Sequence, residues 1–118
     1  MRTVIWVVGE KKEEKLISLL KGKETRILLF GLLPAKESEE EGKEHKLWHS
    51  LFSLKEELSS EGFSVSIATE RGGPSSLLEV ANALNAEMVF LPKEIFLLLG
   101  PLENDDFLNQ ISCPLLLY

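Results

Sequence analysis

The chain has 118 residues, of which 44% are apolar and 27% are charged, and its formal net charge is −6. This length suffices for one domain with a hydrophobic core, and the composition is ordinary for a soluble globular protein. Because the lysines of residues 10–15 are interleaved with glutamates and no basic patch stands elsewhere, nucleic acid is excluded as an expected partner.

The first part of the chain alternates between strand and helix patterns. Residues 3–8 form a continuous β-branched and aromatic run, typical of a strand buried on both faces. Residues 13–21 carry an apolar helix face that ends at Gly22, and residues 26–33 read as a second buried strand. Residues 35–44 are charged and lack periodicity, so we expect a mobile loop there.

The middle of the chain repeats this alternation. Residues 46–60 have apolar side chains at helical spacing, and Gly62 stands where a C-terminal cap belongs. Residues 63–69 alternate apolar and polar side chains, which predicts a strand near a sheet edge. Pro74 then fits the first turn of a helix that Asn85 can end.

The last part adds a fourth strand over residues 86–91, a helix over residues 104–111 capped by Asn104, and a fifth strand over residues 113–118. Strands that alternate with helices predict an α/β domain covering residues 1–118, with a doubly wound parallel sheet and helices on both faces. Right-handed crossovers leave few topologies for such a chain.

The compartment follows from two observations. Cys113 is the only cysteine, so an intramolecular disulfide is impossible, which fits a reducing environment. The apolar run at residues 4–8 is too short for a signal peptide or a membrane span. We therefore expect a cytoplasmic protein with no membrane association.

Residues 54–92 carry a recognisable succession of features. A long helix ends at Gly62 before a strand, the Gly-Gly-Pro turn at residues 72–74 starts a helix, and residues 81–87 lead into another strand. A Cys-Pro pair at residues 113–114 then precedes the final apolar strand. This pattern resembles the universal stress protein family, of the adenine-nucleotide α-hydrolase-like fold group. The resemblance implies a three-layer fold with strand order 3-2-1-4-5.

The resemblance also implies a ligand crevice at the carboxyl ends of strands 1 and 4, where the strand order reverses. The residues that would line it are Gly9, Glu10, Lys11, Leu33, Leu91, Pro92, Lys93 and Gly100.

The glycine motif of ATP-binding members is not matched here. That motif is Gly-x2-Gly-x9-Gly-Ser/Thr after strand 4, and its glycines let the backbone approach the phosphates. Here Pro92 stands near the place of the first glycine, and Gly100 is followed by Pro101, which has neither hydroxyl nor N–H. We therefore expect no cofactor; the alternative is ATP or AMP with magnesium at an atypical site.

The sequence offers little catalytic chemistry. His45 and His49 share a helix face, but no third strong ligand follows at a fixed spacing, so no metal site is predicted. Cys113 has no basic neighbour and is interpreted as an inert thiol. We expect no enzyme; nucleotide hydrolysis stays open as an alternative for which no base or nucleophile can be named.

Two apolar segments point to partners. The run Ile95 to Leu99 has three readings: it fills the crevice, it meets a protein partner, or it lines an apolar pocket. The segment Cys113 to Tyr118 would form an apolar sheet edge, and the resemblance implies a homodimer through it. The expected function is a stress-related regulatory or interaction module without ordinary ATP binding.

Overall fold

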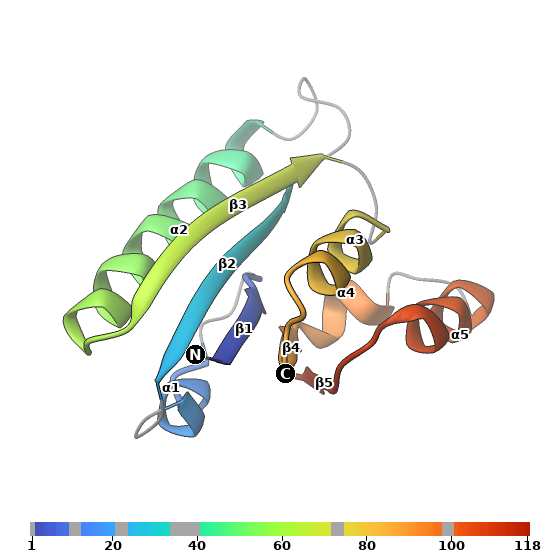
Figure 1. Cartoon of the computed structure of the whole chain (residues 1–118). Helices are drawn as coiled ribbons and strands as arrows, with labels where there is room; N and C mark the ends of the chain where they lie inside the picture. Colours follow the sequence, from blue (N-terminus) through green and yellow to red (C-terminus); the bar gives the residue numbers. More distant parts are fainter. Residues whose placement is uncertain (1, 10–12, 21–23, 34–40, 72–74, 98–100) are drawn as a thin grey trace.

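The structure is a computed structural model that describes residues 2–9, 13–20, 24–33, 41–71, 75–97 and 101–118. Within these residues, five parallel strands form one sheet in the order β3-β2-β1-β4-β5 (Figure 1). The strands are β1 (Arg2–Val7), β2 (Thr25–Leu33), β3 (Ser64–Arg71), β4 (Met88–Leu91) and β5 (Leu115–Leu117). The helices are α1 (Lys15–Leu20), α2 (Glu41–Ser60), α3 (Ser75–Ala83), α4 (Lys93–Leu97) and α5 (Pro101–Gln110). The predicted fold class and strand order are confirmed.

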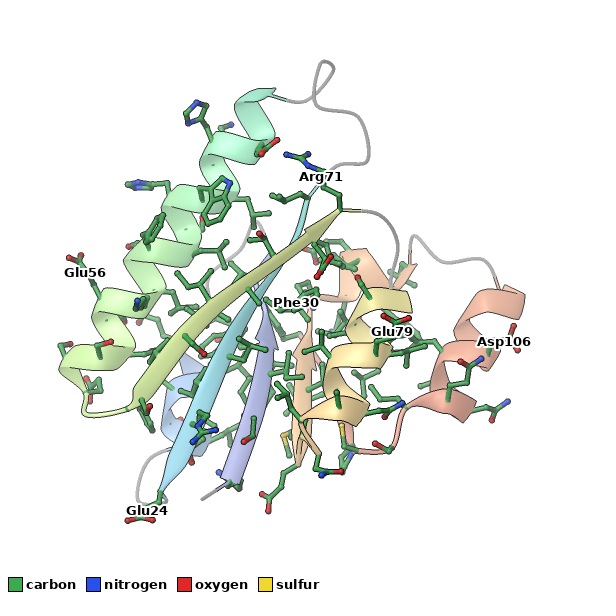
Figure 2. The ribbon with its side chains drawn as sticks, turned by 45° about the horizontal axis from the view of Figure 1, so that its top comes forward. Glu24, Phe30, Glu56, Arg71, Glu79 and Asp106 are labelled. Atoms are coloured by element: carbon green, nitrogen blue, oxygen red, sulfur yellow. The ribbon has the colours of Figure 1, made fainter. Side chains whose placement is uncertain are left out.

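The sheet buries a different set of side chains on each face. On one face, Trp6 of β1 belongs to a first apolar cluster that includes residues of α1 and α2. On the other face, Ile5 and Val7 belong to a second cluster that includes residues of α3 and α5. Phe30, labelled in Figure 2, is fully buried in this second cluster. The alternation follows from the two-residue period of a strand.

The edge strands differ from the central ones as their patterns predict. β3 alternates between exposed and half-buried residues from Ser64 to Ile67, and among the described strands it pairs only with β2. Within the part of the chain that the structure describes, β5 pairs only with β4 and forms the opposite edge. The continuous apolar runs of β1 and β2 lie in the interior of the sheet.

Two helices end at the residues that the sequence indicates. Gly62 has φ of 95° and Asn85 has φ of 52°, which are left-handed conformations. After α2, the Phe63 N–H donates to the Leu58 carbonyl at 3.2 Å. After α3, the N–H of Ala86 donates to the Ala81 carbonyl at 3.1 Å. Each helix is therefore closed by a Schellman motif, in which glycine or asparagine takes the left-handed position.

The structure corrects the predicted start of the second helix. Residues 35–44 were expected to form a loop, but α2 begins at Glu41, while residues 34–40 lie outside the described part. An ion pair of 2.8 Å joins Glu44 to Arg71 at the end of β3, and carboxylates near a helix start also interact favourably with its dipole. These interactions extend the helix into a segment that has no apolar periodicity.

The end of the chain differs from the prediction in two places. Residues 93–97 form the short helix α4, although the apolar run suggested a loop. α5 begins at Pro101, so Asn104 lies within the helix instead of capping it. Proline fits the first turn because the N–H that it lacks would have no helical partner there.

In the ranges that the structure describes, no helix is both long and apolar enough to cross a bilayer.

Candidate functional site

The strand order reverses between β1 and β4, so the carboxyl ends of these strands form the topological switch point, where open α/β sheets bind ligands. Gly9 follows β1 and Pro92 follows β4. A Cβ placed on Gly9 would lie 2.7 Å from Pro92 Cγ, which is a severe overlap. The two residues are therefore in close contact, and the space between the strand ends is closed at this point.

The structure brings together part of the predicted site. Leu91 and Pro92 are buried, and the Lys93 N–H donates to the main-chain oxygen of Tyr118 at 2.6 Å while its side chain is exposed. Leu33 is buried at the end of β2, beyond Phe30, the register partner of Val7. Glu10, Lys11 and Gly100 lie outside the described residues.

Tyr118 occupies the switch point, although its place in the sequence predicts only a position at the sheet edge. Its phenol donates to the Val7 carbonyl at 2.6 Å and accepts from the Trp6 indole N–H at 3.1 Å. Its main-chain N–H donates to the Leu91 carbonyl at 3.0 Å. The side chain therefore extends from beside β5, past β4, to the end of β1.

The surroundings of Tyr118 keep its phenol neutral. Burial raises the pKa of Tyr118 to about 12, and the carboxylates of Glu94 and Glu13 raise it further in the same direction. The Trp6 indole N–H and the Gly9 backbone oppose this shift by stabilising the phenolate. At neutral pH, Tyr118 is thus an uncharged donor in a region of negative potential.

A cavity of about 120 Å³ lies beside Tyr118, between the end of β1, the middle of α2 and the residue Glu13 ahead of α1. Its lining residues are Trp6, Val8, Gly9, Glu13, His49, Ser50, Ser53, Leu54 and Tyr118. Sites for drug-sized ligands and cofactors usually measure about 300–1,000 Å³. The cavity is too small, as it stands, to enclose a nucleotide.

The apolar run after β4 lies on the other face of the sheet. Ile95 and Phe96 pack against the second cluster, and the rings of Phe96 and Phe107 of α5 are 6.5 Å apart in an edge-to-face arrangement. The Leu97 side chain is 73% exposed. Leu98 and Leu99 lie outside the described residues. Of the segment that follows β4, Pro92 meets the end of β1, and the Phe96 side chain packs on the other face.

The remaining titratable candidates are separated. His49 lines the cavity, His45 is exposed, and Cys113 packs against the second cluster. Burial raises the pKa of the Cys113 thiol, which favours its unreactive protonated form. Among the side chains that the structure describes, no three or more His, Cys, Asp and Glu residues gather as a metal site would require.

Sequence reasoning missed most of the side chains around the switch point. The missed residues are Trp6, Glu13, Ser50, Ser53, Glu94 and Tyr118. One signal was present for Tyr118, because parallel strands end at a common edge and a tyrosine at the end of β5 must lie near that edge. Nothing in the spacing of Ser50 and Ser53 within α2 distinguishes them from solvated helix residues.

Comparison with known proteins gives matches only among solved structures. No family model matches the chain, and no curated protein matches it significantly in sequence. A universal stress protein from Archaeoglobus fulgidus aligns with a TM-score of 0.71 and 12% identity, over 99% of this chain and 93% of that one. The chain has the fold of the universal stress proteins.

Two further structures of universal stress proteins carry nucleotides. The Archaeoglobus fulgidus protein in complex with dAMP aligns with a TM-score of 0.70 and 11% identity, over 99% of this chain and 97% of that one. A universal stress protein family protein from Arabidopsis thaliana with AMP bound aligns with a TM-score of 0.63 and 12% identity, over 99% and 90%. The near-full coverage extends the likeness to the whole sheet and its helices.

Proposed function

We propose that this chain is a non-catalytic, stress-related regulatory or interaction module built on the universal stress protein fold, without ordinary ATP binding. The observation that carries the proposal is the occupation of the switch point by the chain itself. Pro92 contacts Gly9, and the Tyr118 phenol is hydrogen-bonded to the end of β1. A nucleotide in this crevice would have to displace a side chain held by two hydrogen bonds.

The arrangement of polar groups also favours a role without catalysis. An activated serine needs a base within hydrogen-bonding reach, and that base needs a group to orient it. Among the described residues, no hydrogen bond joins His49 to Ser50, to Ser53 or to a carboxylate. Among the described residues that line the cavity, no nucleophile is hydrogen-bonded to a base. The absence of any possible intramolecular disulfide is consistent with action in the cytoplasm.

The proposed partner is a second copy of the chain, paired through the edge at β5. The three leucines of β5 carry no charge that would prevent pairing, and Leu117 is 36% exposed. We expect a dimer by size-exclusion chromatography with light scattering at micromolar concentration. Leu117→Lys should give a monomer, whereas Leu108→Lys, which changes an exposed leucine of α5, should leave the dimer intact. A monomeric parent chain would refute this assembly.

The second candidate function is binding of AMP or ATP at an atypical site. The nucleotide-bound structures of the same fold favour it, since dAMP and AMP are present in two of them. In this alternative, the exposed ammonium group of Lys93 would interact with the phosphates, together with Lys11, which lies outside the described residues.

Thermal unfolding separates the two functions. A ligand that binds only the native state at about 100 times its Kd adds about 2.7 kcal/mol of stability, which raises the melting temperature by several degrees. We expect no such rise for the parent chain with millimolar AMP or ATP and magnesium. A rise of several degrees that disappears in Lys93→Ala would replace the first proposal with the second.

A further inference from the structure

The cavity beside Tyr118 is lined by both apolar and acidic residues. Trp6, Val8 and Leu54 contribute apolar surface, and Tyr118 adds a second aromatic ring. Glu13 also lines the cavity and contributes a carboxylate. Aromatic rings together with a carboxylate form the environment that attracts ammonium groups, through the negative faces of the rings and a charge-assisted hydrogen bond.

Two carboxylates make the potential here negative. Glu13 lines the cavity, and one oxygen of Glu94 lies 3.2 Å from the position that a Cβ would take on the lining residue Gly9. Both carboxylates act on the phenol of Tyr118, whose pKa they raise. Among the described residues that line the cavity there is no lysine or arginine, and the whole chain carries a net charge of −6.

The polar groups that line the cavity are available to a ligand. Glu13 uses one carboxylate oxygen to accept the Lys15 N–H at 3.2 Å, which leaves its other oxygen for a second donor. Within the described part of the chain, the hydroxyls of Ser50 and Ser53 donate to no other protein group. A bound ammonium group has three donors and can use such acceptors together.

The volume limits the size of the ligand. A cavity of roughly 150 Å³ binds benzene, so a cavity of about 120 Å³ has room for an apolar group of roughly four to six carbons. We infer that this cavity binds a small organic cation, a protonated primary amine whose apolar body lies against Trp6, Val8 and Leu54 while its ammonium group faces Glu13. This inference does not depend on the function proposed above.

Other ligand classes fit these residues less well. A carboxylate or phosphate ligand would face the charges of Glu13 and Glu94 with no lysine or arginine among the described lining residues to compensate. Calcium and magnesium ions prefer six or more oxygen ligands, whereas part of this lining is indole and aliphatic carbon. The apolar surface of Trp6, Val8 and Leu54 therefore favours an organic cation over an inorganic one.

Three probes of similar size separate the effect of charge from that of size. We would titrate the full chain with 1-butylamine, 1-butanol and sodium butyrate at pH 7 and constant ionic strength, following amide signals and the Trp6 indole N–H by NMR. The indole reports on the site because it donates to the Tyr118 phenol. Butylamine should shift the Trp6 and Ser53 signals saturably and bind about three- to tenfold more tightly than butanol, with butyrate weakest.

Matched variants test the role of the carboxylate. Glu13→Gln keeps an oxygen to accept the Lys15 N–H, so the fold should persist, but butylamine affinity should fall about three- to tenfold toward that of butanol. Glu56→Gln removes the same charge from the outward face of α2 (Figure 2) and should leave the affinity unchanged.

Several results would overturn the inference. Equal affinity for butylamine and butyrate, or equal affinity of the parent chain and Glu13→Gln for butylamine, would show that the cavity does not recognise positive charge. Shifts that appear first at residues remote from the cavity would place the binding elsewhere. Displacement of butylamine by magnesium chloride at equal ionic strength would reassign the site to a metal ion.

Discussion

The two sides of the sheet differ at its carboxyl edge. On the α3 and α5 side, Phe96 and Phe107 form an edge-to-face pair, and Phe107 is only 3% exposed. On the α2 side, a tyrosine, a tryptophan and two carboxylates surround the end of β1, and a cavity remains. The comparison indicates that the apolar residues after β4 stabilise one face, while the chemistry available to a ligand lies on the other.

The largest expected effect comes from disrupting the packing on the α3 and α5 side of the sheet. Phe107→Ala removes a buried ring and leaves a cavity, which should lower the free energy of unfolding by about 3–5 kcal/mol. Leu108→Ala, in the neighbouring exposed position, should change it by less than about 0.5 kcal/mol. Urea unfolding curves of both variants measure the difference. Similar losses of unfolding free energy in the two variants would mean that α5 does not pack against the second cluster as described.

The next effect concerns the polar side and its pH dependence. The folded-state pKa of Tyr118 is about 12 and its ordinary value is 10.0. The neutral phenol therefore contributes to the free energy of unfolding in full below pH 10, and this contribution is lost as the pH rises toward 12. The loss should amount to at most about 2.7 kcal/mol, and to less where solvent screens the partly exposed phenol.

This prediction can be measured directly, because Tyr118 is the only tyrosine of the chain. Tyrosinate absorbance reports its ionisation without interference from another residue, and chemical denaturation at each pH reports stability. In Tyr118→Phe the stability change between pH 10 and 12 should shrink. Titration near pH 10 in the folded protein would show that the phenol is not held as described.

A further pair of variants tests the contact between the two strand ends. Gly9→Ala places a methyl group 2.7 Å from Pro92 Cγ and should destabilise the fold by about 1–3 kcal/mol. Gly42→Ala, in a helical position with no atom within 4 Å, should instead stabilise by about 0.5–1 kcal/mol. Thermal unfolding of the two variants gives the signs. A neutral Gly9→Ala would mean that the strand ends are further apart.

Most of the architecture follows from local patterns. The buried runs of β1 and β2, the alternation in β3, and the helix ends at Gly62 and Asn85 each depend on nearby residues, so sequence reasoning places them correctly. The start of α2 was misplaced because the ion pair between Glu44 and Arg71 joins residues 27 apart. A charged segment without apolar periodicity is predicted as a loop when the residue that forms an ion pair with it is distant in the sequence.

Only the location of the candidate site could be predicted from the sequence. Topology alone brings Gly9 and Pro92 to the same edge. It does not reveal that Tyr118 reaches Val7 and Trp6, because that depends on the direction of a side chain two strands away. The cavity likewise depends on how α2 approaches β1, which the apolar spacing of α2 does not fix.

The hydrogen bond between Trp6 and Tyr118 has a consequence for folding kinetics. It joins residues 112 positions apart, so it closes one of the longest loops that this chain can form. Contacts between residues so far apart in the sequence stabilise the chain only after the intervening strands have paired, and they slow folding. Environment-sensitive fluorescence of Trp6, in a Trp48→Phe background, should therefore reach its native value in the last observable refolding phase.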